Sequence, residues 1–350
     1  MKINRLLHNI AVRTACLIAG VATLASCNGM MYDGEGDCDP YHKVKFVFDK
    51  NLSFTDAFDK EVNAVTLYVI DAATGNIVWS KSESGDNVRS SGYLMDVDVP
   101  PGDYRLLAWC GEGKDTHFTV PDAAHFTGLT CALNRGRDEA GAVSKEALNR
   151  LYHGHVEKET FVDEEGVHIH TVELVKDTNH VNVVLQNLSG KPIDKDNFTF
   201  RITDCNGSMD WDNSLLDDEL ITYHPHNVAS GSAGIVTPDP TDPKPTDPKT
   251  ASRSITQVNT CVAQFTTGRL VKGQDMRVII TNSKGREVLN IPLIDYSLLV
   301  KGHYESLDDQ DFLDRQDKYD LVFFLDDRDE WVSTYIYVNA WHKVPQIVDL

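Results

Sequence analysis

Apolar and polar residues alternate with a period of two along most of the chain, which is the pattern of β-strands with one buried face. In the first half, alternating segments together with β-branched, aromatic and apolar runs predict strands at residues 44–48, 62–70, 77–79, 93–99 and 104–109. The turn between the second and third of these contains Gly75-Asn76, as expected for a hairpin. Residues 145–151 are the one helix predicted here. Short strands at this spacing are typical of an antiparallel β-sandwich, which we assign to residues 41–166.

A second series of alternating segments predicts another sandwich over residues 167–350. Its strands are expected at residues 168–175, 181–185, 198–203, 258–265, 276–281, 288–293, 321–325 and 332–338. Prolines are dense between the third and fourth of these, where Thr-Asp-Pro-Lys occurs at 241–244 and again at 246–249. Proline lacks the backbone donor that a sheet needs. We therefore predict that residues 230–252 form an exposed, disordered loop inserted between two strands.

The N-terminal residues have the features of an export signal. Basic residues precede an apolar, charge-free run at 15–25 that is too short to remain as a membrane-spanning helix. The small pair Ala25-Ser26 directly before Cys27 resembles the lipobox of bacterial lipoprotein precursors. This resemblance implies that residues 1–26 are removed as a signal peptide and that Cys27 is lipidated. An ordinary secretory signal or a buried N-terminal helix is the alternative. The acidic, Gly-rich stretch that follows predicts a flexible tether over residues 27–40.

Composition narrows the classes of function. The chain has 350 residues, more than one compact core usually holds, and a formal net charge of −20. A surface this acidic argues against nucleic acid and anionic lipid headgroups as partners. Seven cysteines are present, and none of them forms a CxxC pattern. With Cys16 in the signal and Cys27 lipidated, the other five are expected mainly as buried apolar residues, and a Cys110–Cys131 disulfide stays open.

The sequence contains no GxSxG, no HExxH, no phosphate-binding glycine loop and no EF-hand spacing. We therefore predict no enzyme activity, no metal and no cofactor other than the covalent lipid on Cys27. Three His-x-His pairs occur, at residues 153/155, 168/170 and 224/226. Each would place two metal ligands on one strand face, but without an evident third ligand we interpret them as surface or core-edge residues. The acidic clusters at 308–311 and 326–330 lack the ligand spacing of a calcium loop, and solvated loops are expected there.

Short motifs follow one another in a fixed order along nearly the whole chain behind Cys27. They lie at residues 44–49, 56–58, 65–71, 101–104, 107–109, 151–154, 174–179, 312–315, 319–321 and 336–341. Among them are Val-Lys-Phe-Val-Phe-Asp at the start and Ile-Tyr-Val-Asn-Ala-Trp at the end. Together they resemble the fimbrial anchor lipoproteins of Bacteroidales, which are associated with type V pili. Ala340, where that pattern has glycine, and the Pro-rich insertion depart from it.

The resemblance implies an all-β protein with two tandem antiparallel, transthyretin-like β-sandwiches behind the lipoprotein signal peptide. It also implies a non-enzymatic protein that anchors a type V pilus at the outer face of the outer membrane. Its partners would be a fimbrial stalk subunit and, through the lipid on Cys27, the membrane; no nucleic acid is expected. In stalk subunits of this group an Arg-directed protease removes the first strand, and a neighbour's strand fills the groove. No arginine lies between Arg13 and Arg89, so we expect this chain to keep its first strand and to cap or limit assembly.

The docking surface is then expected at the other end of the molecule, in residues 331–348. Its candidate partner-binding residues are Trp331, Ile336, Val338 and Trp341. The same alternation also fits a plain core strand of the second sandwich. Two other functions stay open: a stalk or tip subunit of the same pilus, or a surface lipoprotein that binds glycans through exposed aromatic residues. The tryptophans are Trp79, Trp109, Trp211, Trp331 and Trp341, and all but Trp211 lie in or beside predicted strands, which favours core packing.

Overall fold

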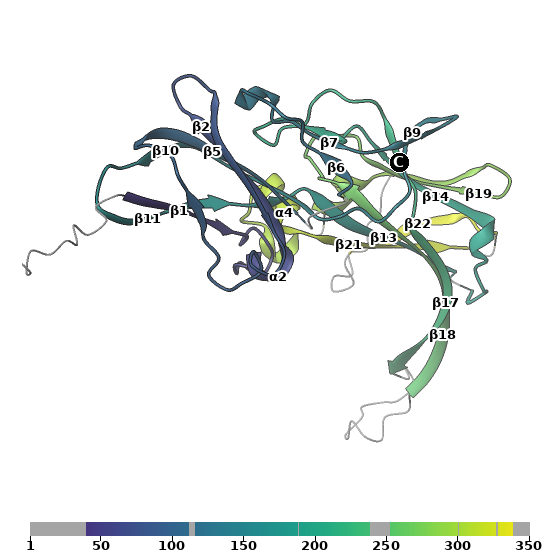
Figure 1. Cartoon of the computed structure of the whole chain (residues 1–350). Coiled ribbons are helices and arrows are strands. Elements are labelled where there is room, and N and C mark those ends of the chain that lie inside the picture. Colours follow the sequence, from purple (N-terminus) through teal and green to yellow (C-terminus); the bar gives the residue numbers. More distant parts are fainter. Residues whose placement is uncertain are drawn as a thin grey trace, which may run out of the picture.

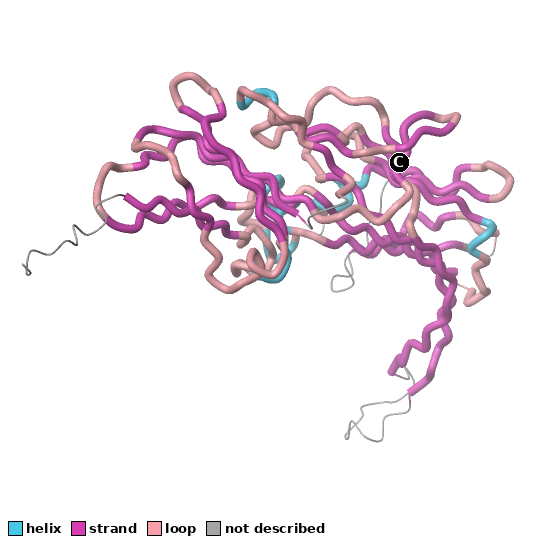
Figure 2. The backbone as a smooth tube through the Cα atoms, in the orientation of Figure 1, coloured by secondary structure: helices cyan, strands magenta, loops and turns pink. Residues whose placement is uncertain are grey.

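The computed structural model describes residues 40–111, 116–187, 189–238, 253–299, 301–326 and 328–338. Most of its regular elements are strands (Figures 1 and 2). Their buried apolar side chains form two cores. The predicted all-β class is therefore confirmed. None of the helices in these ranges is long and apolar enough to span a membrane.

The first core lies between two sheets and beneath one short helix. Its elements are β1 (Pro40–Val47), α2 (Phe58–Glu61), β2 (Ala64–Asp71), β3 (Ile77–Ser84), β4 (Met95–Val97), β5 (Gly102–Gly111), β10 (Leu151–Phe161), β11 (Gly166–Glu173) and β12 (Val175–Lys176). One sheet has the order β11-β1-β4 and the other β12-β10-β5-β2-β3. Alternate residues of each strand enter the core, for example Val44 and Phe46 from β1 and Leu67 from β2.

The second core is larger and lies between a five-stranded and a six-stranded sheet. The first of these has the order β17-β18-β13-β21-β22 and contains β13 (Thr178–Asn187), β17 (Asn227–Pro238), β18 (Arg253–Gly268), β21 (Lys318–Leu325) and β22 (Trp331–Val338). The other has the order β20-β19-β14-β16-β9-β8 and contains β8 (Gly136–Asp138), β9 (Gly141–Ser144), β14 (Phe198–Asp204), β16 (Ile221–Tyr223), β19 (Arg277–Asn282) and β20 (Glu287–Pro292).

Smaller elements cover the ends of the second core. They are β6 (Phe118–Thr119), β7 (Cys131–Leu133), β15 (Ser208–Met209), α3 (Leu293–Leu298), α4 (Asp309–Arg315) and the 3-10 turns Phe126–Gly128, Lys195–Asn197 and Gly302–Tyr304. The three short strands form a sheet of order β15-β7-β6.

The sheet that contains β5 is covered on both faces. Leu106 and Ala108 point into the first core, whereas Leu107 and Trp109 point into the second. This explains why residues 106–110 read as a continuous apolar run and not as an alternation. The two sandwiches therefore share packing through this strand.

Strand pairing differs from the prediction in three places, because β1 pairs with β11, β13 with β21, and β9 with β16 in parallel. The segment predicted as 168–175 does not open the second series of strands. As β11 it lies beside β1, and Val172 and Leu174 fill the first core. Conversely, Phe118 and Cys131 belong to the second core. Alternation tells which face of a strand is buried but not which core receives it.

The helix predicted at 145–151 is wrong, because residues 145–150 form a loop that leads into β10. The N–H of Leu148 donates to Thr266 Oγ1 at 3.1 Å, and that of Asn149 to His117 Nδ1 at 3.1 Å. These partners, distant in sequence, satisfy donors that a helix would have used for its own backbone.

The first part of the segment predicted as a Pro-rich loop is a strand. Residues 230–238 are not a loop but part of β17, paired from Ser230 opposite Cys261 to Pro238 opposite Arg253. Figure 1 shows that this hairpin of β17 and β18 extends away from the two cores. The rest of the predicted loop, 239–252, lies outside the described residues.

The acidic cluster at 308–311 is the start of a helix and not a solvated loop. Asp308 is the N-cap of α4 and accepts a hydrogen bond from the N–H of Gln310 at 2.9 Å. Asp309 pairs with Lys272 at 2.7 Å and with Lys301 at 2.9 Å. Carboxylates are favoured at this end of a helix because free backbone N–H groups point towards them.

Candidate docking site

The first strand is held along both of its edges. β1 pairs in parallel with β11 over its whole length, from Pro40 opposite Gly166 to Val47 opposite Glu173, and in antiparallel with β4. Val44 and Phe46 are 0% and 2% exposed in the first core. The groove that a neighbour's strand would need is thus filled by the chain's own strand.

The last described strand lies at the edge of its sheet. β22 pairs with β21 on one side, with Val338 opposite Leu321 and Ile336 opposite Phe323. In the part of the chain that the structure describes, no strand pairs with its other side. An unpaired strand edge offers a row of backbone donors and acceptors to an incoming strand.

The four predicted docking residues are distributed unevenly. Trp331, Ile336 and Val338 all lie on β22, whereas Trp341 lies outside the described residues. The Trp331 ring is half-buried and packs edge-on against Phe323, with 6.2 Å between ring centroids. Trp331 is therefore anchored on the second core.

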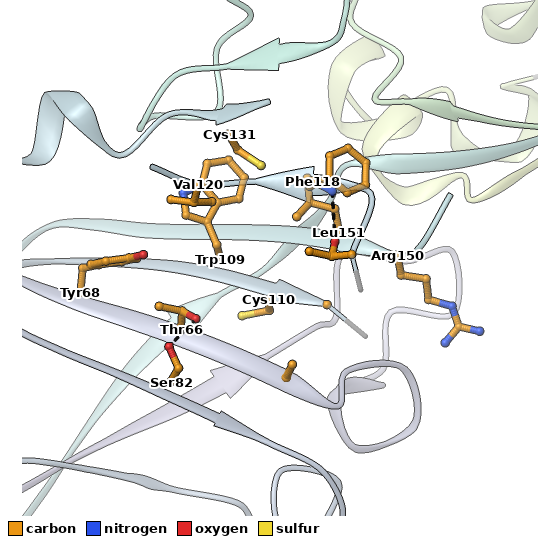
Figure 3. A pocket seen from close by; sticks show the side chains of 13 residues that line it. Thr66, Tyr68, Ser82, Trp109, Cys110, Phe118, Val120, Cys131, Arg150 and Leu151 are labelled. Carbon is orange, nitrogen blue, oxygen red and sulfur yellow. Dashed lines mark hydrogen bonds between the residues drawn. The ribbon is translucent and has the colours of Figure 1, made fainter. Parts of the chain in front are cut away.

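A pocket of about 260 Å³ lies where the segment 116–120 crosses the sheet that contains β2 and β5 (Figure 3). Its wall is aromatic at Tyr68, Trp109 and Phe118 and polar at Thr66 and Ser82, whose hydroxyl groups are 2.8 Å apart. None of the described residues that line it is a carboxylate or a histidine. The described lining residues thus provide no carboxylate–histidine pair for acid–base catalysis.

The Cys110–Cys131 disulfide, which the sequence left open, does not form, because both residues are free thiols. They line the same pocket from β5 and β7, and their sulfur atoms lie apart across it (Figure 3). Burial raises the pKa of each thiol, so both stay protonated and unreactive. They pack as small apolar residues, as we expected for most of the cysteines.

The His-x-His pairs do not assemble a metal site in the described ranges, where no three metal-ligating side chains come together. His153 is buried, and its Nε2 lies 2.8 Å from the carbonyl oxygen of Trp211. Burial lowers its pKa to about 3, so the ring is neutral and donates this hydrogen bond. His153 therefore ties β10 to the segment around Trp211.

Trp211 is not a free platform for a sugar ring. It is half-buried and packs edge-on against Phe126, with 4.7 Å between ring centroids. The guanidinium carbon of Arg105 lies 6.0 Å from its ring centre and 4.7 Å from that of Phe126. These neighbours, which the sequence did not suggest, occupy much of the aromatic surface that a glycan would use.

Charged side chains connect the two cores where β12 leads into β13. Lys176 is 4% exposed, and its Nζ lies 3.4 Å from Glu61 Oε2 and 2.6 Å from Asp317 Oδ1. The next residue, Asp177, is fully buried and accepts a hydrogen bond from Asn213 Nδ2 at 2.8 Å. Arg269 lies 3.9 Å away and makes its closest contacts with Asp314. A buried charge network thus fixes the junction.

Asp177 makes the stability of this junction depend on pH. Burial raises the pKa of its carboxyl to about 7, against a usual value near 3.8. The folded protein therefore holds a proton on Asp177 that the unfolded chain releases. The stabilisation of the folded state by this proton is complete below about pH 4 and is lost as pH rises through 7. We expect Asp177→Asn to remove this decline, which urea unfolding between about pH 5 and pH 8 measures. An unchanged pH slope in the variant would contradict the assignment.

Comparison with known proteins places this chain among fimbrial proteins. The sequence model of a family described as the fimbrillin-A associated anchor proteins Mfa1 and Mfa2 matches residues 35–346. No curated protein sequence matches the chain.

Solved structures match over most of the chain. A putative adhesin from Bacteroides thetaiotaomicron is 30% identical with a TM-score of 0.75, and the match covers 89% of this chain and 100% of that one. A structure of putative polysaccharide binding proteins from the same species is 28% identical, covers 88% and 100% of the two chains and has a TM-score of 0.71. The fimbrial anchor protein Mfa2 from Porphyromonas gingivalis is 17% identical, covers 88% and 100%, and with a TM-score of 0.60 shares the fold.

Proposed function

The chain belongs to the family of fimbrillin-A associated anchor proteins, and from this premise we propose that it is an outer-membrane lipoprotein that anchors a type V pilus and limits its assembly. Membership in this family confirms the resemblance to fimbrial anchor proteins that the sequence motifs indicated. It supports a pilus-associated role at the cell surface. It also supports a non-enzymatic function, as do the adhesin-like relatives. A fimbrial stalk subunit is the proposed protein partner.

Attachment to the membrane is assigned to lipid on Cys27. The lipobox-like Leu24-Ala25-Ser26-Cys27 supports this assignment, as does the acidic, Gly-rich stretch that follows. About a dozen residues separate Cys27 from β1, which is long enough to hold a folded domain clear of the lipid surface.

The state of the first strand supports a terminal position in the pilus. β1 is paired on both edges and fills the first core, and no arginine lies between Arg13 and β1 as a cleavage point. A subunit whose groove stays filled cannot accept a neighbour's strand there. We therefore assign the limiting function to the first sandwich.

Docking of the stalk subunit is assigned to the C-terminal strand. The observation that carries this assignment is the position of β22 at a sheet edge, with no described strand on its outer side. Ile336 and Val338 lie on this strand, and the proposed surface continues through Trp341 to residue 348. The partner strand would add to the sheet through backbone hydrogen bonds.

Truncation after Asn339 tests this assignment. We expect the truncated protein to stay attached to the membrane, while fibres are shed into the medium because the docking surface is shortened. Immunoblots of fibre subunits in cells and in medium measure the effect. The matched control ends after Val348 and removes only the last two residues, so it should retain fibres. Because β22 ends at Val338, normal attachment and length of fibres in the Asn339 truncation would show that residues 340–348 are not part of the docking surface.

A further inference from the structure

Two buried histidines from neighbouring strands contact each other at the first strand. Nδ1 of His42 on β1 lies 2.9 Å from Nε2 of His170 on β11. The second nitrogen of each ring is also engaged: His42 Nε2 lies 3.2 Å from the carbonyl oxygen of Val162, and His170 Nδ1 lies 2.7 Å from Glu159 Oε1. The two residues are 3% and 6% exposed, so water cannot replace these partners.

Aromatic packing fixes both rings. Phe161 stacks on His170 with 4.0 Å between centroids and on His42 with 4.4 Å. Tyr104 of β5 packs edge-on against Phe161, and its hydroxyl donates to the carbonyl of Pro100. The rings therefore cannot turn away from each other without disturbing the first core.

The other polar groups around the pair are already engaged. His168 lies 5.3 Å from His42 between ring centroids, but its Nε2 contacts the backbone carbonyl of Glu164 at 2.8 Å. On β4, the ladder partner of His42 is the apolar Val97, and the adjacent Asp96 pairs with Lys43. Among the described residues, Glu159 is the carboxylate hydrogen-bonded to the pair.

Counting protons on this site gives its charge. The contacts with Val162, between the rings and with Glu159 each need one N–H, so three are required. Two neutral imidazole rings supply two. A pair that carries one extra proton supplies all three, and the Glu159 carboxylate balances its single positive charge. A second extra proton would place hydrogens on both nitrogens that face each other and would leave neither as an acceptor.

We propose that His42, His170 and Glu159 form a proton-binding site that keeps β1 in its sheet while the histidine pair holds one extra proton, and that releases the strand when a second binds. The ligand is the proton, and the element that responds is the strand that fills the first core. This inference goes beyond the pilus assignment, because the site would act in the isolated protein whether or not β22 docks a subunit.

The direction of the response follows from the environment of His42. Burial, and next the positive charge of His170, lower its pKa below the usual 6.5. In an opened strand the ring returns to water and takes up a proton near 6.5. The contribution of His42 to the stability of the closed state is therefore complete above about pH 6.5 and is lost as pH falls below it. Because one proton is taken up when β1 leaves its sheet, the equilibrium constant for this opening changes by up to about tenfold per pH unit.

Hydrogen exchange of backbone amides in the purified protein tests the site. After correction for intrinsic exchange, protection of the Val44 and Phe46 amides should fall between pH 7 and pH 5, by up to about tenfold for each pH unit below 6.5. The Val183 amide in β13 serves as an internal reference. His42→Gln should abolish the fall because glutamine binds no proton. His168→Gln is the matched control on the same sheet, and it should keep most of the fall, because that ring contacts the carbonyl of Glu164 and affects the pKa of His42 less than burial or His170 does.

Direct titration of the rings by NMR in the unmodified protein does not depend on the variant folding. The His42 ring should take up its proton below the usual pH 6.5, over the same pH range in which β1 loses protection. Titration of the His42 ring at or above pH 6.5 would overturn the proposal. So would β1 protection that is equal at pH 7 and pH 5, or a fall that persists in a folded His42→Gln protein. Either result leaves the pilus assignment untouched, since no fibre is present in these measurements.

Discussion

Replacing Cys27 with alanine is expected to release a folded protein from the membrane into the soluble fraction. Buried acyl chains contribute about 0.8 kcal/mol per CH₂, so two or three chains hold a soluble domain firmly on the membrane. Their loss should move almost all of the protein into the soluble fraction. Folding should survive because both cores are completed by residues that follow Pro40. Membrane fractionation, labelled palmitate and a melting curve of the released protein measure the three parts of this result.

Cys38→Ala is the matched control for that experiment. Like Cys27, Cys38 precedes β1 in the sequence, but it has no lipobox before it. It should keep both the label and the membrane fraction. Equal incorporation of palmitate into wild type and Cys27→Ala would exclude lipidation at this position. Release of the variant in an unfolded state would instead show that the lipid end contributes to folding.

Strand positions were largely predictable because alternation of apolar residues is a local property. Each strand expected from the pattern is present, with β2, β5, β13 and β21 close to their predicted ranges. The pattern does not predict β10, although β10 is an interior strand of its sheet. Gly154 interrupts its pattern, and an irregularity between Val156 and Glu159 shifts the side-chain alternation. A period-two search cannot recognise a strand whose period changes along its length.

Pairing and polar contacts were not predictable, because their partners are distant in sequence. The parallel neighbour of β1 begins at Gly166, and His42 contacts a residue 128 positions away. His42 also belongs to no His-x-His pair, so the motif search found only its partner His170. β22 was a candidate because its alternation is local, but its position at a sheet edge appears only in the assembled sheet.

The polar contacts at the junction between the two cores also could not be predicted from the sequence. Arg269 forms two hydrogen bonds of 2.8 Å with the carboxylate of Asp314, a residue 45 positions away, and it donates to the carbonyl oxygen of Asn213 at 2.9 Å. Its sequence neighbours gave no sign of this role. A bidentate arginine that also binds a carbonyl is fixed in geometry, and its side chain is only 13% exposed.

Replacing Arg269 with alanine should destabilise the protein by about 3–5 kcal/mol, because removal of one partner leaves a buried charge without compensation. Asp314, whose side chain is 5% exposed, would lose its cation. Above pH 7 the ionised Asp177 would add a second buried carboxylate, so the loss should be greater at pH 8 than at pH 5. Urea unfolding at the two pH values measures both the size and the direction of this effect.

Arg286→Ala provides the matched control for this prediction. Arg286 makes an ion pair of 2.8 Å with Glu330, as short as that of Arg269, but the two side chains are 53% and 48% exposed. Its loss should cost less than about 1 kcal/mol, because water already solvates both charges. Equal effects of the two variants would mean that burial does not determine the strength of the Arg269 network. A clear difference, largest at pH 8, follows if Arg269 neutralises both Asp314 and Asp177.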